Sequence, residues 1–241
     1  MPDVLKSELL RSFSGFAMLG VASFAILIPS LMLTVGPPVD GLRQLDDGPA
    51  TRIVFGLIAS IGVVAMYLGS YAVSREHYYR SMPRSLVITS LRRVFLSKLV
   101  ASAITSVLLC LLGAAIWAVV TGVVLAFHGR QLQVDGAFWA ILLGSLFAAT
   151  SGAAIGVSLG WVVRNYYAVS GVVLLIPLMI ELPLLFTVPQ LERFLPVGAF
   201  AGVTGAPIDG LLPWWGSALV LAGWAVATAV LAVVTVRRRE P

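Results

Sequence analysis

Six apolar runs, each long enough to cross a lipid bilayer, limit what this chain can fold into. A helix needs about 20 residues to cross the hydrocarbon core of a bilayer. Runs of this kind lie near residues 15–35, 53–73, 97–127, 138–163, 166–188 and 214–236. Backbone groups inside a bilayer have to find hydrogen-bond partners within the protein, which an α-helix provides. The sequence therefore predicts an all-α polytopic membrane protein with six transmembrane helices in a single transmembrane domain over residues 1–241.

The low content of charged residues supports this class. Charged residues make up 11% of the chain and hydrophobic residues 59%, whereas soluble domains carry about 25% charged residues. The net charge of +5 does not indicate a nucleic-acid partner, because the basic residues cluster beside the apolar runs. That distribution is typical of contact with a lipid bilayer. The single cysteine, Cys110, cannot form a disulfide within the chain.

The basic residues also predict the orientation. Two of them, Lys6 and Arg11, precede the first apolar run as in a signal peptide, but the run exceeds the roughly 7–15 residues of a signal-peptide core. We therefore interpret it as a retained span. With both termini cytoplasmic, twelve Lys and Arg residues lie inside and four outside, namely Arg43, Arg52, Arg130 and Arg193. Positive residues are enriched on the cytoplasmic side, which predicts a multi-pass protein with both termini in the cytoplasm. We expect its membrane to be a cell membrane, the inner or plasma membrane of a bacterium.

Two segments outside the spans have their own predicted structure. Residues 1–14 place apolar and charged residues at helical spacing, which predicts an interfacial helix lying in the membrane surface; the alternative is a short frayed tail. Residues 189–213 are mildly apolar and interrupted by four prolines. They predict a re-entrant outer segment before the last span, formed by two short helices, because non-helical backbone at membrane depth has to be buried in protein or line a cavity. The alternative is a plain extracellular loop.

The fourth run contains small residues at every fourth position, which form one ridge on a helix. They are Gly144, Ala148, Gly152, Gly156 and Gly160. Such a ridge lets another helix backbone approach closely. The sequence leaves open whether that helix belongs to the same chain or to a second subunit.

Several kinds of chemistry are not expected. The two histidines, His77 and His128, lie at span edges, so neither a metal site with N or S ligands nor a histidine-activated serine nucleophile is predicted within the spans. A phosphate-binding P-loop ends in Gly-Lys-Ser or Gly-Lys-Thr. The only lysines, Lys6 and Lys98, follow Leu5 and Ser97. We therefore expect no enzyme activity and no cofactor in this chain, and any ATP would be bound by another one.

Glu181 is the one acidic residue inside a predicted span, between Pro177 and Pro183. A carboxylate in a membrane is expensive and by default indicates function, so Glu181 is a possible residue of a transport pathway. The alternative is a carboxylate near the outer interface that hydrogen-bonds to the re-entrant segment. The two prolines also predict a broken or kinked helix here.

A dense polar segment, SREHYYRSMPRSLVITSLRRVFLSK, separates the second and third runs. Pro83 suits the first turn of a helix, and Val87, Leu91 and Val94 then form an apolar stripe. Ordinary membrane anchoring explains the arginines but not the glutamate, the two tyrosines and the stripe together. The segment therefore predicts a short amphipathic cytoplasmic helix near 83–95.

With these features the chain resembles the membrane-spanning permease subunits of type-2 ABC transporters (the ABC-2 permease family). That family has a surface helix, six spans and a re-entrant outer segment. Its loop between spans two and three carries an acidic residue, a short helix, basic residues and a lysine that opens span three. Here Glu76, the helix near 83–95, Arg92-Arg93 and Lys98 occupy those places.

The resemblance implies the function. A separate ABC ATPase, present in two copies and holding ATP and Mg²⁺, would receive the coupling region 76–95 in a groove. A second permease chain, identical or homologous, would complete the substrate pathway. The residues implied in ATPase coupling are Glu76, Tyr78, Tyr79, Arg80, Arg84, Leu86, Arg92 and Arg93.

The alternative function is a secondary carrier subunit, driven without ATP, or a membrane scaffold. A carrier is expected to show internal repeats and coupling-ion residues near mid-membrane, and Glu181 alone resembles such a residue. For the permease, no feature for docking a periplasmic receptor is discernible, which favours export over import. The apolar spans suggest an amphipathic or lipophilic cargo, and the resemblance implies one such as a drug, antibiotic, lipid or peptide.

Overall fold

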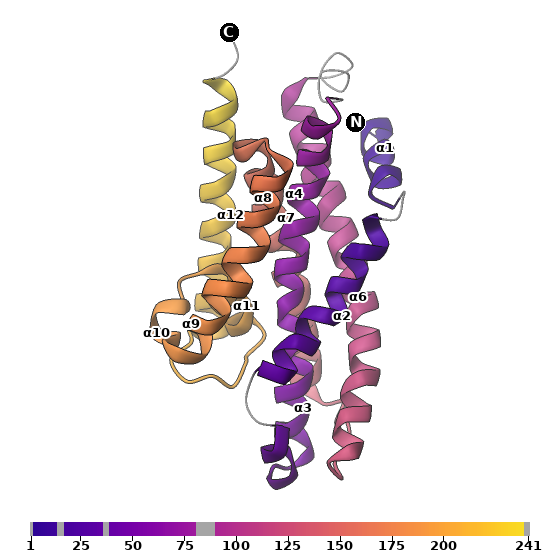
Figure 1. Cartoon of the computed structure of the whole chain (residues 1–241), viewed down its shortest axis with the longest axis vertical. Helices are drawn as coiled ribbons and strands as arrows, with labels where there is room; N and C mark the ends of the chain where they lie inside the picture. The colour runs from indigo at the N-terminus through magenta and orange to yellow at the C-terminus, as the bar shows by residue number, and fades with distance from the viewer. Residues whose placement is uncertain (1, 14–16, 36–38, 81–89, 239–241) are drawn as a thin grey trace.

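A computed structural model describes residues 2–13, 17–35, 39–80 and 90–238 of the chain (Figure 1). The described residues form only helices, turns and connecting segments, with no strand among them. The helical elements, in order, are α1 Pro2–Phe13, α2 Ala17–Val35, η1 Val39–Gln44, α3 Asp47–Gly56, η2 Leu57–Ser60, α4 Ile61–Tyr78, α6 Leu91–Phe127, α7 Gly136–Val163, α8 Tyr166–Leu175, η3 Ile176–Glu181, α9 Leu182–Thr187, α10 Pro189–Glu192, α11 Pro196–Val203 and α12 Trp214–Arg237.

Five continuous helical segments among the described residues are long and apolar enough to cross a membrane. They are Asp47–Tyr78, Arg92–Phe127, Gly136–Val163, Tyr166–Thr187 and Trp214–Arg237. Each matches one of the predicted spans from the second to the sixth. The predicted first span corresponds to α2, whose apolar part Leu19–Thr34 is shorter than the other five. The all-α class is thus confirmed, and these five helices are long and apolar enough to span a membrane, which indicates a membrane protein.

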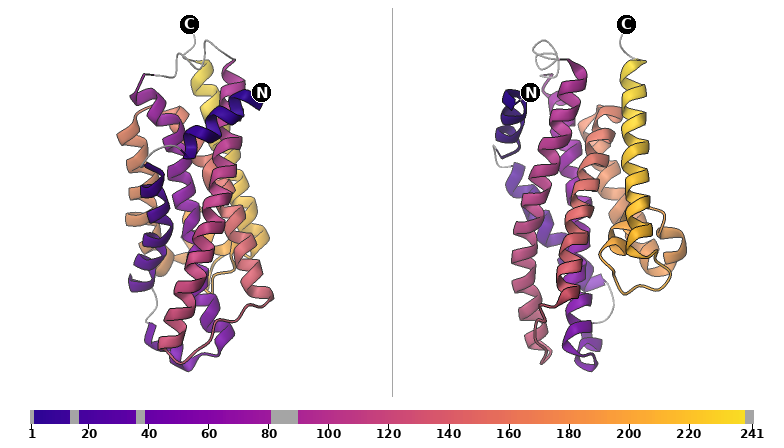
Figure 2. Two further views of the ribbon diagram at one scale, coloured as in Figure 1. Left: turned by 90° about the vertical axis from the view of Figure 1, so that its right-hand side faces the viewer. Right: turned by 180° about the vertical axis from the view of Figure 1, so that it is seen from behind.

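The helices form an elongated bundle around α7, which contacts α4, α6 and α12 (Figure 2). Both α2 and α6 lie on one side of α4, while α8 and α12 lie on the other (Figure 1). The helix α1 and the last turn of α12 lie at the same end of the bundle, which we call the termini end (Figure 1). The end of α4 and the start of α6 lie there too.

Polar residues at the ends of two helices explain where they begin. The carboxylate of Asp135 accepts hydrogen bonds from the backbone N–H groups of Ala137 and Phe138, at 2.9 and 3.0 Å. Asn165 accepts one from the N–H of Ala168 at 3.0 Å. Such N-caps satisfy donors that have no partner within the helix. They fix the first residues of α7 and α8.

The helix α6 contains 37 residues and is about 55 Å long, longer than a whole bilayer of about 40–45 Å. Residues Leu91–Phe95 form its first turns. The separate amphipathic helix predicted near 83–95 is therefore corrected for its last five residues, which belong to α6 itself. Its earlier part lies in 81–89, outside the described residues.

The helical segment Tyr166–Thr187, predicted as the fifth span, is irregular, as its prolines predict. A π-helical turn over Ile176–Glu181 joins α8 to α9. Pro177 and Pro183 have no N–H to donate to the preceding turn, which disturbs regular α-helical hydrogen bonding. The helix stays continuous to Thr187.

The segment 189–213 contains two short helices, α10 and α11, as predicted. All eight residues of α11 are buried, because the helix packs against α7 and α12. Much of this segment is therefore held by protein and does not form a freely solvated loop.

Large apolar side chains face outward along α6 and α12. Leu112 and Val119 of α6 are 56% and 68% exposed, and Leu219 and Val226 of α12 are 66% and 63% exposed. A soluble monomer rarely exposes apolar surface of this extent. These two faces are suited to lipid or to another apolar protein surface.

Candidate functional site: a buried ion-pair cluster at the termini end

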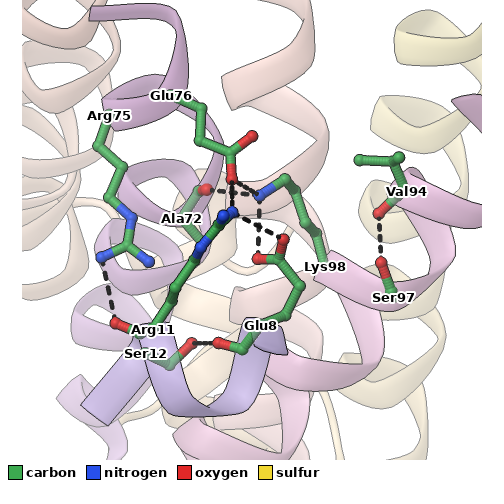
Figure 3. Close-up of polar contacts among 9 residues, drawn as sticks. All are labelled: Glu8, Arg11, Ser12, Ala72, Arg75, Glu76, Val94, Ser97 and Lys98. Atoms are coloured by element: carbon green, nitrogen blue, oxygen red, sulfur yellow. Dashed lines mark hydrogen bonds and ion pairs between the residues drawn. The ribbon is translucent and has the colours of Figure 1, made fainter. Parts of the chain in front are cut away.

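The Lys98 side chain is completely buried, with 0% of its surface exposed. Its ammonium group lies 2.6 Å from Glu76 Oε1 and 3.0 Å from Glu8 Oε2, and it donates a third hydrogen bond to the Ala72 carbonyl at 3.1 Å (Figure 3). An ammonium group has three donors, so each of them has a partner. Such complete pairing allows a charge to remain buried.

Three helices contribute to this cluster, which we define as Glu8, Arg11, Glu76 and Lys98 (Figure 3). Glu8 and Arg11 lie one turn apart on α1, with Arg11 Nη1 3.5 Å from Glu8 Oε1. Glu76 belongs to the last turn of α4 and Lys98 to the early turns of α6. Arg11 Nη1 also donates to Glu76 Oε1 at 2.9 Å. The two carboxylates thus hold the three helices together through the two cations.

The cluster contains two positive and two negative groups and is neutral as a whole. The carboxylates are nearly as buried as the lysine, with 6% of the Glu8 and 4% of the Glu76 side chain exposed, whereas 49% of Arg11 is exposed. A buried charge that loses its partner is strongly destabilising. We conclude that α1, α4 and α6 cannot separate here without large cost, so a displacement of one is transmitted to the others.

A small open pocket of about 300 Å³ lies beside the cluster, lined by Arg11, Tyr71, Arg75, Glu76 and Tyr79. Arg75 donates to the Arg11 carbonyl at 3.3 Å, and its guanidinium lies 5.3 Å from the centre of the Tyr71 ring. These contacts extend the connection between α1 and α4 to the surface.

The residues implied in ATPase coupling fall into three groups. Glu76 is 3% exposed and belongs to the cluster, so it does not itself lie on the surface of the chain; its implied role in ATPase coupling stays a prediction. The exposed members are Tyr78, Tyr79, Arg80, Arg92 and Arg93. Arg84 and Leu86 lie outside the described residues.

The exposed members lie at both edges of the undescribed segment. Tyr78 contacts the ring of Tyr167 on α8 at 5.9 Å, edge to face, so part of its surface already has a partner within the chain. Tyr79 is 72% exposed. Arg80, just after the end of α4, has a left-handed backbone conformation, with φ of 53°.

The small-residue ridge of α7 faces helices of the same chain. A side chain at Gly152 would meet the Gly62 carbonyl, and one at Gly156 would meet the Met66 carbonyl of α4. Gly160 lies against Ser70 and Val73 of α4, and Gly144 against Val203 of α11; Ala148 is fully buried. The partner helix that the sequence left open is therefore intramolecular at these positions.

Glu181 lies beside a second buried carboxyl group, Glu192. Glu181 Oε2 accepts a hydrogen bond from the Val197 N–H at 2.9 Å, and Glu192 Oε1 accepts one from the Gly198 N–H at 3.1 Å. Burial, together with the neighbouring Glu181, raises the pKa of Glu192 to about 8. A protonated Glu192 can donate to Glu181, so the two groups link the fifth span to α10 and α11.

Sequence reasoning missed Glu8, Arg11 and Glu192 as members of polar sites. The signal for the first two was available: Glu8 and Arg11 are spaced for one face of α1, and Lys98 is a lone lysine at the start of an apolar run that requires a counter-charge. Glu192 gave no comparable signal, because an acidic residue between spans is ordinary. Within the described parts of the chain, no three His, Cys, Asp or Glu residues gather in a geometry that could hold a metal ion.

The sequence matches no family model, and no curated protein sequence matches it significantly. The function is therefore inferred from the chain's own residues and geometry.

Proposed function

We propose that this chain is the transmembrane permease subunit of an ATP-driven ABC exporter of type 2. The buried cluster carries the proposal. It joins α1, the end of α4 and the start of α6 (Figure 3), and the segment proposed to dock on an ATPase connects the last two of these helices. Movement of the docking segment would therefore be transmitted to two spans and to α1 together.

The proposed topology has six spans, with α2 as the first. The 19 residues of α2 extend about 28 Å as a helix, close to the thickness of the hydrocarbon core. The helix ends at the termini end carry Arg75, Arg92, Arg164 and Arg237. Because positive residues favour the cytoplasmic side, we place this end and both chain termini in the cytoplasm of a bacterial cell, with α1 as the interfacial helix.

The docking surface would consist of the exposed residues Tyr79, Arg80 and Arg93 with the segment between them. Arginines at this surface suit an acidic groove on an ATPase dimer. That dimer, and not this chain, would bind ATP and Mg²⁺. Two permease chains would form the pathway between them. Glu76 and Lys98 would act behind this surface by holding it to the spans.

The proposed cargo is amphipathic or lipophilic, because the faces of the long helices are apolar. The segment of α10 and α11 would be the re-entrant outer segment, consistent with its burial against α7 and α12. Glu181 would then fasten this segment to the fifth span through its bond to Val197.

Co-purification tests the proposal. The tagged chain, extracted from its native membrane in mild detergent, is expected to bring down a stoichiometric protein that contains a P-loop. The variant Arg80→Ala/Arg93→Ala is expected to lose that protein while still inserting into the membrane. This double variant leaves the cluster intact, whereas deletion of the whole coupling region 76–95 would also remove Glu76.

The matched control is Arg43→Ala/Arg52→Ala, which removes two exposed arginines from the sequence predicted to lie outside. It should retain the ATPase. Absence of a P-loop protein from the wild-type preparation, or equal loss in both variants, contradicts the proposal.

The Glu181–Glu192 pair favours a second candidate, a proton-driven secondary carrier subunit. Two neighbouring buried carboxyl groups can exchange one proton, and ionisable groups in spans often mark proton pathways. Transport by the purified chain alone in vesicles with an imposed pH gradient, abolished by Glu192→Gln, would favour the carrier over the permease.

A further inference from the structure

A pocket of about 330 Å³ opens at the termini end, where α6, α7 and α12 meet. Its walls are largely apolar and are formed by Phe95, Leu96, Trp161, Ala232, Val233 and Val236. Leu96 and Val233 are 37% and 41% exposed. They continue the outward-facing apolar surfaces of α6 and α12, so the pocket opens on the face suited to lipid.

Two arginines also line this pocket, Arg92 from the first turn of α6 and Arg237 from the last turn of α12. Both are exposed, and neither has a carboxylate partner within the described part of the chain. Guanidinium groups bind phosphate through paired hydrogen bonds. Two of them at one apolar pocket match a ligand that has an anionic head and an apolar body.

Trp161 forms the inner part of the pocket wall. Its side chain is only 1% exposed, and its ring lies near that of Phe95, with 6.2 Å between the ring centres. The inner part of the pocket is therefore apolar, and the charged groups lie at its edge.

We propose that this pocket binds one anionic phospholipid. Its phosphate group lies between Arg92 and Arg237, and one acyl chain follows the apolar wall of α12. The site shares Arg92 with the residues implied in ATPase coupling, but it uses none of the cluster and none of the docking residues Tyr79, Arg80 and Arg93. Its test therefore does not depend on the proposed exporter function. Zwitterionic lipid is expected to bind less well, since its head carries no net negative charge for the two arginines.

Native mass spectrometry of the full-length chain in detergent tests this proposal. Delipidated protein is titrated with phosphatidylglycerol or with phosphatidylcholine of the same acyl chains. The wild type is expected to retain one phosphatidylglycerol in preference to phosphatidylcholine. Each arginine near anionic lipid contributes about fivefold in affinity, so Arg92→Gln/Arg237→Gln is expected to bind phosphatidylglycerol roughly thirtyfold more weakly.

The neighbouring residues supply a matched control. Arg93→Gln/Arg238→Gln removes the same charge from the same two helix ends, but neither residue lines the pocket. This variant should bind within about twofold of the wild type. Equal loss in the two double variants would mean a general surface attraction and would overturn the proposal.

Two further measurements identify the occupant. Excess glycerol phosphate, which has the head without the chains, should not displace the lipid, and displacement would show a phosphate-ion site instead. Val233→Trp fills the apolar wall and should weaken phosphatidylglycerol binding without lowering the melting temperature. A wild-type chain that binds neither lipid, because another part of the chain or a second copy fills the pocket, overturns the proposal.

Discussion

Replacing Lys98 with methionine tests whether the buried cluster holds the three helices together. Methionine preserves much of the length of the lysine side chain but removes its charge. The cluster then changes from two positive and two negative groups, net zero, to a net charge of −1. Glu8 and Glu76 remain, with 6% and 4% of their side chains exposed, and only Arg11 is left to compensate them.

The expected loss of stability comes from the distances. At 2.6 and 3.0 Å from the ammonium group, each carboxylate is attracted by roughly 5–6 kcal/mol at an effective dielectric constant of about 20. Desolvation of the charges offsets much of this attraction in the intact cluster. Removing one partner leaves that desolvation uncompensated, and such changes cost about 3–5 kcal/mol. Because Arg11 still pairs with both carboxylates, we expect about 3 kcal/mol.

Thermal unfolding of the purified chain in detergent, followed by far-UV circular dichroism, measures this loss. For a chain of this size, about 3 kcal/mol lowers Tm by roughly 6–12 °C. The matched control is Lys6→Met, because Lys6 is the only other lysine and is exposed on α1. An exposed substitution of this kind should change stability by less than about 0.5 kcal/mol.

A second substitution separates charge from shape. Lys98→Met/Glu76→Gln returns the cluster to net zero, with Arg11 and Glu8 still paired, and should recover at least half of the lost stability. The role assigned to the cluster is refuted if Lys98→Met unfolds like Lys6→Met, or if adding Glu76→Gln destabilises the chain further by an independent amount.

Three other measurements test separate parts of the structure. Arg11→Ala should lower the free energy of unfolding by less than about 1 kcal/mol, because 49% of the side chain is exposed and solvent screens such pairs. A loss of stability as large as that of Lys98→Met in the same assay would contradict the assigned geometry. Gly156→Ala should lower Tm, because its new methyl group would meet the Met66 carbonyl and overpacking of this kind lowers the free energy of unfolding by about 1–3 kcal/mol. The control Gly122→Ala, with open space around it, should leave Tm unchanged or raise it. Burial and the neighbouring Glu181 raise the pKa of Glu192 from 4.5 to about 8, so the folded state binds more protons than the unfolded state between these pH values. Stability should therefore fall as pH rises from about 4.5 to about 8. Glu192→Gln should flatten this part of the stability profile, and an unchanged slope would show that Glu192 does not titrate there.

The predicted spans illustrate what periodicity and hydropathy can reveal. Residues 138–163 and 214–236 correspond to α7 and α12 within a few residues, because a long apolar run has no stable alternative to a helix in a bilayer. The helix near 83–95 shows the limit. Its stripe is compatible with helix, but the stripe does not say whether the chain turns after Phe95 or continues straight. In the structure it continues straight, and Leu91–Phe95 form the start of α6.

Glu76 shows why site residues are harder to predict than spans. In the sequence it stands among arginines, a histidine and tyrosines, and this polar setting suggested a surface. In the structure it is the acceptor of both Lys98 and Arg11. The pairing joins residues separated by 22 and 65 positions in the chain, and no local pattern contains contacts of that range.

By itself the sequence determined the all-helical class and the places of the long apolar helices, because these result from the cost of placing polar groups in an apolar medium. Only the tertiary structure decided which carboxylates meet Lys98, that the ridge of α7 faces α4 and α11 in the same chain, and that Glu181 lies beside Glu192. These outcomes depend on the relative positions of whole helices, which side-chain packing between distant segments sets.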